Sequence, residues 1–246
     1  MEQANMRPDE ATAAYAWVRR QYARVREAVE EAAVKAGRPP GEIRLMAVTK
    51  TVDEALIREA IAAGASLLGE NRVQELVRKR PLLPLESCEM HLIGHLQSNK
   101  AAKAVECADM IEAVDSLRLA RELSRCCEKQ GKEMRVLLEV NIGSDAAKFG
   151  FAPAQTAQAA EEIAALPGIK VCGLMTVPPI SDDQRQTAKF FSRMHQLFID
   201  MRGKNVDNLS MDILSMGMSG DFPLAIAEGS TLVRIGSAIF GRREYR

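Results

Sequence analysis

A single lysine stands where a strand-like run of apolar residues ends. The segment LMAVT at 45–49 precedes Lys50. Because side chains alternate across a strand, Lys50 shares a face with Met46 and Val48. Loss of solvation on an apolar face favours a neutral amine, and a neutral amine can attack an aldehyde to form a Schiff base. The alternative is a solvated lysine that begins a surface loop.

Two stretches of small residues have the composition of phosphate-binding loops. Ser215 and Met216 belong to LSMGMSG at 214–220, and Gly236 and Ser237 belong to RIGSAIFG at 234–241. Each stretch follows a predicted strand and precedes a predicted helix. Glycine permits close backbone approach, hydroxyl groups donate hydrogen bonds, and the first turn of a helix offers N–H groups. The alternative is that both stretches are tight turns.

Two further polar residues lie at or near strand ends. Arg234 falls inside the last predicted strand, two residues before Gly236. A buried arginine requires partners, either an inward carboxylate or a ligand ring or phosphate. Asn71 ends the segment GEN at 69–71. It could orient a ligand or cap the helix that follows.

Other chemistries receive little support from the sequence. His91 and His95 are four residues apart, but Gly94 and the predicted strand disfavour a helical metal pair, and His195 is the remaining histidine. A zinc site is therefore disfavoured. The sequence also lacks a nucleophile elbow, a dinucleotide-binding GxGxxG motif and a Walker loop.

The elements that must position these residues alternate between short apolar runs and helical patterns, which predicts an α/β fold. The predicted strands are 43–48, 66–69, 90–93, 110–113, 136–140, 170–174, 213–215 with a possible earlier start, and 232–235. The predicted helices between them are 53–63, 73–79, 117–128, 153–165 and 182–201. Eight such units favour a closed (β/α)₈ TIM barrel, with an open sheet as the alternative. A barrel would gather the strand ends at one mouth, with phosphate sites after the last two strands.

An additional amphipathic helix is predicted over residues 9–35. Val18, Tyr22, Val25 and Val29 recur at spacings of four, three and four, and GRPPG at 37–41 ends the helix. We expect one domain over residues 1–246, in which the N-terminal helix occupies 1–41 and the barrel 42–246. No linker-like segment divides the chain.

Composition excludes several classes of partner. The 33 basic and 33 acidic residues give zero formal charge, which argues against nucleic-acid binding. No apolar run approaches the length of about 18 residues that a membrane helix needs, and no signal peptide is evident. The five cysteines are odd in number and form no CxxC pair, which fits a reducing, cytoplasmic compartment.

The motifs together resemble one known family. They are AVTKT at 47–51, GEN at 69–71, HLIGHLQSNK at 91–100, AVDS at 113–116, LLEVNI at 137–142, GLMTVPP at 173–179, LSMGMSGD at 214–221 and GSTLVRIGSAIFG at 229–241. In this order they resemble the YggS/PROSC family of pyridoxal 5′-phosphate (PLP) homeostasis proteins. The resemblance covers essentially the whole chain after residue 40.

The resemblance implies the type III PLP fold, similar to the N-terminal domain of alanine racemase. It makes Lys50 the Schiff-base lysine, Arg234 the residue that faces the pyridine nitrogen, and Asn71 a residue of the cofactor pocket. The phosphate-binding residues that it implies are Ser215, the backbone around Met216, Gly236 and Ser237.

Three residues near the expected barrel mouth can also be compared with the family pattern. Lys148 resembles a family lysine suggested to assist PLP exchange. His95 stands where the family more often has a small residue or proline, and Phe149 stands where a small polar residue is usual. These departures concern the rim of the pocket.

The expected pocket favours a carrier over an enzyme. An arginine at the pyridine nitrogen weakens the ring as an electron sink, and racemisation needs two bases. Alanine racemase takes a tyrosine from a second domain, whereas this sequence ends at Arg246 and has only Tyr15, Tyr22 and Tyr245. We therefore expect a monomeric PLP homeostasis protein that passes PLP to apo-enzymes without robust turnover. The alternatives are a weak amino-acid racemase and a Schiff-base aldolase without PLP.

Overall fold

The computed structural model of the chain is a closed barrel of eight parallel strands. It describes residues 8–145, 147–204 and 206–241. The strands follow one another in sequence order around the barrel, and the last pairs with the first. Their bounds are β1 (Arg44–Val48), β2 (Leu67–Glu70), β3 (Glu89–Leu92), β4 (Met110–Val114), β5 (Met134–Glu139), β6 (Ile169–Met175), β7 (Leu209–Ser215) and β8 (Leu232–Ile235). The predicted (β/α)₈ barrel is confirmed.

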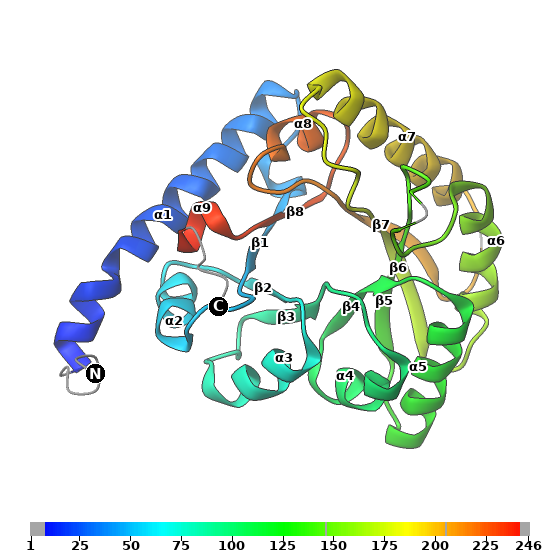
Figure 1. The fold of residues 1–246 in the computed structure, drawn as a ribbon, viewed down its shortest axis with the longest axis horizontal. Coiled ribbons are helices and arrows are strands. Elements are labelled where there is room, and N and C mark those ends of the chain that lie inside the picture. Colours follow the sequence, from blue (N-terminus) through cyan, green and yellow to red (C-terminus); the bar gives the residue numbers. More distant parts are fainter. Residues whose placement is uncertain (1–7, 146, 205, 242–246) are drawn as a thin grey trace.

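Helices surround this inner ring of strands (Figure 1). Their bounds are α1 (Pro8–Lys35), α2 (Glu54–Ala62), α3 (Val73–Lys79), α4 (Ala101–Cys107), α5 (Leu117–Gln130), α6 (Pro153–Ala164), α7 (Gln184–Arg202), α8 (Phe222–Ala227) and α9 (Ser237–Phe240). The short helices α4, α8 and α9 were not delimited by the sequence pattern, because a helix of one or two turns shows too little periodicity.

The two faces of β1 pack into different parts of the core. Leu45 and Ala47 belong to the large core between the sheet and the helices. Met46 and Val48 belong to a smaller cluster of residues from neighbouring strands inside the barrel. The period-two pattern therefore predicted the inward face of this strand correctly, and the same face continues to the end of the strand.

The N-terminal helix covers the seam where the barrel closes. Helix α1 packs against α2, α8 and α9 and runs beside β1 and β8 (Figure 1). Its predicted apolar stripe is buried within the chain, from Val18 at 0% exposure to Val25 at 8%. After the helix ends, the Arg38 guanidinium donates to the carbonyl oxygens of Ile226 (2.9 Å) and Ser230 (2.6 Å), which fixes the entry into the barrel.

Most predicted boundaries lie within two residues of the observed ones, and the start of β7 differs most. Strand β7 starts at Leu209, earlier than the apolar run at 213–215 suggests. Helix α7 begins at Gln184 because the Asp183 side chain accepts a hydrogen bond from the Arg185 N–H and caps the helix. In the described part of the chain, no helix is both long and apolar enough to cross a membrane.

Candidate functional site

A cavity of about 590 Å³ opens at the C-terminal ends of the strands. Residues from β1 and β8, and from the segments after β1, β2, β3, β6, β7 and β8, contribute to its wall. The lining residues are Val48, Lys50, Asn71, Ile93, Val177, Met218, Ser219, Gly220, Arg234, Gly236 and Ser237. The structure therefore brings together five residues that the sequence singled out, namely Lys50, Asn71, Arg234, Gly236 and Ser237.

Lys50 is half-buried and lies directly after β1, above Val48 on the inward face. The preceding residue, Thr49, is fully buried, and its N–H donates to the Gly69 carbonyl oxygen at 2.9 Å. The following residue, Thr51, has a left-handed backbone with φ of 58°. The turn at Thr51 ends the strand and leaves Lys50 at the barrel mouth, as the sequence predicted.

A buried lysine holds both neighbours of the candidate lysine in place. Lys79 is fully buried, and its Nζ donates to the Thr49 carbonyl oxygen (2.7 Å), Glu70 Oε1 (2.7 Å) and Glu75 Oε2 (2.8 Å). Glu75 Oε2 also accepts from the Thr51 N–H at 2.7 Å. Sequence inspection missed this cluster. The available signal was the Glu75–Lys79 spacing of four on a helix, which usually describes an exposed pair.

Asn71 enters the cavity wall from the segment after β2. The residue that caps α3 is Arg72, so Asn71 does not fill the capping role considered from sequence. Its backbone packs against Gly94, where a Cβ atom would lie 2.3 Å from the Asn71 carbonyl oxygen. Glycine at position 94 is therefore needed to let the two loops approach each other.

Arg234 is 5% exposed and points into the cavity from β8. Its Nη1 donates to Ser215 Oγ at 2.6 Å and its Nη2 donates to the Thr176 carbonyl oxygen at 2.8 Å. Burial lowers the pKa of Arg234, and the nearby Glu112 and Glu139 carboxylates act against that shift. These hydrogen bonds go to a hydroxyl and a carbonyl oxygen. The direct ion pair with a carboxylate, one of the two alternatives considered from the sequence, is replaced by an indirect link to Glu112 through Ser215.

The residues of the loop after β7 that line the cavity lie further along the chain than the sequence suggested. Ser215 is fully buried beneath the Arg234 guanidinium, and Met216 is fully buried in the core outside the barrel. The backbone N–H of Met216 donates to a carbonyl oxygen of β8 at 3.1 Å. Neither residue lines the cavity, whereas Ser219 and Gly220 of the same loop do.

Lys148 lies in the loop after β5 and bonds to the loop after β6. Its Nζ donates to the carbonyl oxygens of Val177 (3.2 Å) and Pro178 (3.0 Å). Val177 is itself part of the cavity wall. Lys148 therefore acts on the cavity through the loop that it holds.

The two rim residues that depart from the family pattern contact each other. The His95 and Phe149 rings are stacked, with centroids 3.7 Å apart. His95 Nδ1 also lies 2.9 Å from Asp115 Oδ2, which orients the imidazole. The stack joins the loops after β3 and β5, and nothing in the sequence pattern indicates that these positions meet.

A carboxyl group with a shifted pKa lies close to the mouth. The pKa of Glu139 is raised to about 7, because burial disfavours the carboxylate and the Asp115 charge repels it. The positive charges of Arg234 and Lys148 act in the opposite direction. Glu139 can therefore exchange a proton near neutral pH.

Other candidate groups do not form a second centre. Among the described residues, no three His, Cys, Asp or Glu side chains are grouped to hold a metal ion. His91 lies inside the barrel and His95 at the rim. Tyr15 and Tyr22 belong to α1, and neither lines the cavity. Tyr245, the third tyrosine considered above, lies outside the described residues.

The donor set of the cavity suits an aldehyde that also carries an anionic group. An amine stands on one wall, and a guanidinium, two serine hydroxyls and several glycine-containing turns stand on the others. Neutral hydrogen-bond donors and a guanidinium are suited to phosphate recognition, and an amine can condense with an aldehyde. The residues therefore fit a phosphorylated aldehyde such as PLP.

Comparison with known proteins gives the same family throughout. The family profile described as "Alanine racemase, N-terminal domain" matches residues 18–244. The pyridoxal phosphate homeostasis protein of Pseudomonas aeruginosa is 39% identical over 91% of this chain and 94% of its own length. The protein of the same name from Escherichia coli strain K12 is 40% identical over 91% and 95%.

Solved structures agree with these relatives. A protein of unknown function from Bifidobacterium adolescentis has a TM-score of 0.88 at 38% identity, covering 98% of this chain and all of its own. PipY of Synechococcus elongatus, solved with PLP bound, has a TM-score of 0.76 at 38% identity, covering 87% of this chain and 100% of its own. Alanine racemase of Streptomyces coelicolor, at 21% identity and a TM-score of 0.71, shares the fold over 95% of this chain and 59% of its own. The chain therefore belongs to the family of pyridoxal phosphate homeostasis proteins, which are built on the alanine racemase N-terminal domain.

Proposed function

We propose that this protein binds PLP as a Schiff base on Lys50 and serves in intracellular PLP homeostasis without robust catalytic turnover. The observation that carries the proposal is the cavity in which Lys50, Arg234, Gly236 and Ser237 meet. Relatives that carry the name pyridoxal phosphate homeostasis protein, and a homologue solved with PLP bound, support the choice of cofactor.

Each wall of the cavity has a role in this proposal. The Lys50 amine condenses with the aldehyde, and Asn71 contacts the ring. Gly236 and Ser237 bind the phosphate together with the end of the loop after β7. Arg234 faces the pyridine nitrogen. In this proposal Ser215 supports Arg234 by accepting its hydrogen bond. Met216 contributes through its backbone, at the start of the turn that leads to the cavity.

The same geometry argues against efficient catalysis. A guanidinium at the pyridine nitrogen disfavours its protonation and so weakens the electron sink that PLP supplies when bound. Of the described residues that line the cavity, none is Tyr, His, Asp or Glu. Lys50 could serve as a base on one face of a bound amino acid, but the described wall supplies no acid or base on the opposite face, where racemisation requires one.

A weak amino-acid racemase is the second candidate function. The observation in its favour is Glu139, whose pKa of about 7 would allow it to exchange a proton near the mouth. Loss of turnover in a Glu139→Gln variant that still binds PLP would support the racemase. Absence of turnover in the unmodified protein would support the carrier.

The proposal includes the setting in which the protein acts. We propose a cytoplasmic monomer that keeps PLP bound and passes it to apo-enzymes that depend on PLP. The exposed position of the mouth loops supports transfer, because Phe149 is 55% and Met218 is 37% exposed. Size-exclusion chromatography with light scattering tests the oligomeric state.

Borohydride trapping tests the central claim. The protein is supplied with PLP, reduced with borohydride and digested, and the modified lysine is identified by mass spectrometry. The adduct is expected on Lys50 and absent from Lys50→Ala, while Lys148→Ala serves as a matched control that keeps the adduct. An unmodified Lys50 in the presence of excess PLP would contradict the Schiff base.

A further inference from the structure

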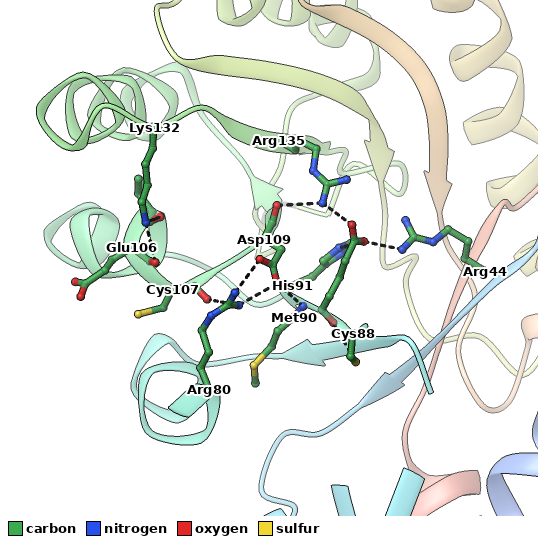
Figure 2. A network of polar contacts seen from close by, with 12 residues as sticks. Arg44, Arg80, Cys88, Met90, His91, Glu106, Cys107, Asp109, Lys132 and Arg135 are labelled. Atoms are coloured by element: carbon green, nitrogen blue, oxygen red, sulfur yellow. Dashed lines mark hydrogen bonds and ion pairs between the residues drawn. The ribbon is translucent and has the colours of Figure 1, made fainter. Parts of the chain in front are cut away.

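A row of buried charges begins at the end of the barrel opposite the mouth. Glu89 accepts hydrogen bonds from Arg44 Nη2 at its Oε2 and from Arg135 Nη2 at its Oε1, both at 2.7 Å. Figure 2 shows the two arginines reaching toward each other from different strands, near His91. Glu89, Arg44 and Arg135 are each about one-third exposed, so this end of the row meets solvent.

His91 is the second member of the row and lies between two carboxylates. Its Nε2 is 3.2 Å from Glu89 Oε2 and its Nδ1 is 2.8 Å from Glu112 Oε1. An ionised carboxylate only accepts hydrogen bonds, so both ring nitrogens must carry a proton to satisfy these contacts. Burial lowers the pKa of His91, but the hydrogen bonds that it donates to both carboxylates, together with their charges, outweigh burial and raise it. The side chain is therefore held as an imidazolium.

The row continues from His91 to the arginine of the cavity. Glu112 is fully buried, and its second oxygen accepts from Ser215 Oγ at 2.7 Å. Ser215 Oγ in turn accepts from Arg234 Nη1 at 2.6 Å. Because a guanidinium can only donate, the Ser215 proton must point to Glu112. The direction of every hydrogen bond between His91 and the cavity is thus determined.

The charges of the row alternate along the barrel. Arg234 is positive, Glu112 negative, His91 positive and Glu89 negative. Burial alone would raise the pKa of Glu112, but the hydrogen bond and charge of His91 outweigh it, so that the pKa is lowered. Each buried charge is therefore stabilised by the next, which is the condition under which ions remain charged inside a protein.

We propose that His91 and Glu112 are positioning residues for Arg234. They keep its guanidinium fixed and charged where it faces the pyridine nitrogen, acting through the Ser215 hydroxyl. This inference rests on the proposed function, in which Arg234 faces PLP. It goes beyond that function because it assigns a role to buried residues that do not line the cavity.

Three variants and one control test the row. Glu112→Gln removes the central negative charge, His91→Gln removes the imidazolium, and Ser215→Ala breaks the link while leaving all charges in place. Asp109→Asn is the matched control, because Asp109 lies near the same end of the barrel and pairs with Arg80, outside the row. Each protein is titrated with PLP, and the absorbance of the bound cofactor is recorded as a function of pH.

Glu112→Gln is expected to weaken PLP binding about tenfold or more, because a hydrogen bond that supports a charged group is lost. His91→Gln and Ser215→Ala are expected to weaken it by smaller factors and to displace the pH profile of the absorbance in the same direction as Glu112→Gln. Asp109→Asn is expected to lower thermal stability and leave affinity and profile unchanged. The proposal is overturned if Ser215→Ala and His91→Gln leave affinity and profile unchanged as well.

Two further measurements keep the outcome interpretable. If Glu112→Gln does not fold, Ser215→Ala decides the question, because it removes no charge. In the protein without PLP, nitrogen NMR of His91 as a function of pH should show a pKa above the ordinary value of 6.5, and an unshifted or lowered pKa would overturn the row. Failure of PLP to bind the unmodified protein would contradict the proposed function, whereas the NMR result would stand independently of it.

Discussion

The His95 imidazole and the Phe149 ring lie face to face at the barrel mouth, with an angle of 12° between their planes. One ring comes from the loop after β3 and the other from the loop after β5. Phe149 directly follows Lys148, whose amine is bonded to carbonyl oxygens of the loop after β6. The loop after β5 is thus joined to the loop after β3 by Phe149 and to the loop after β6 by Lys148. These contacts hold the rim of the cavity in place.

We expect Phe149→Ser to accelerate the exchange of PLP. Stacked aromatic pairs contribute about 0.5–1.5 kcal/mol, and loss of this contact would free the loops more often, which corresponds to roughly a two- to tenfold faster release. The measurement is transfer of PLP to a trapping apo-enzyme. Ile180→Ser is the control, because Ile180 is 99% exposed and apolar on a neighbouring loop. Equal rates for the two variants would contradict a role for the stack.

Gly94→Ala should weaken PLP binding by displacing Asn71. The added Cβ would lie 2.3 Å from the Asn71 carbonyl oxygen, so one of the two loops must move. Forced overlap of this kind costs about 1–3 kcal/mol, and part of this is expected as lost affinity. Isothermal titration with PLP measures it. Gly203→Ala is the control, because nothing lies within 4 Å of the added Cβ there. Unchanged affinity in Gly94→Ala would contradict a role for Asn71 in binding PLP.

Glu139 makes stability depend on pH around neutrality. Its pKa is raised from 4.5 to about 7, so the folded protein binds the proton more tightly than the unfolded chain. The resulting stabilisation is complete below pH 4.5 and is lost as pH rises through about 7. Relative to the unmodified protein, Glu139→Gln should therefore gain about 2–3 kcal/mol above pH 8 and nothing near pH 4. Urea unfolding at a series of pH values measures the difference. A constant difference across this range would show that Glu139 does not titrate as described.

Lys79 should be essential to the stability of the turn around Lys50. Its removal in Lys79→Met leaves Glu70 and Glu75 without their buried cation, which costs about 3–5 kcal/mol. Adding Glu70→Gln should recover part of that loss, because Glu70 is then no longer a buried unpaired charge. Urea unfolding measures both variants.

The control for Lys79 is a lysine with an exposed partner. Lys204 pairs with Glu161 at the surface, where both side chains are more than one-third exposed. Lys204→Met should therefore change the free energy of unfolding by less than about 1 kcal/mol. Similar losses for Lys79→Met and Lys204→Met would contradict the importance of the buried cluster.

The barrel and the position of Lys50 could be predicted from the amino-acid sequence. Eight apolar runs separated by helical patterns predicted the strands, and period-two alternation assigned Met46 and Val48 to the inner face. The loops at the ends of the strands contained Asn71 and Gly236, which line the cavity. Such features follow from local rules, because helix and strand periodicity and turn composition are read over a few neighbouring residues.

The interaction partners of these residues, by contrast, depend on the folded arrangement of the whole chain. Ser215 was expected at a phosphate, but it bonds to Glu112, 103 residues away in sequence, and supports Arg234. The pairing of Lys79 with Glu70 depends in the same way on the packing of α3 against β2. The position of one strand relative to another sets such contacts. That position results from closing the whole barrel, which no local pattern in the sequence encodes.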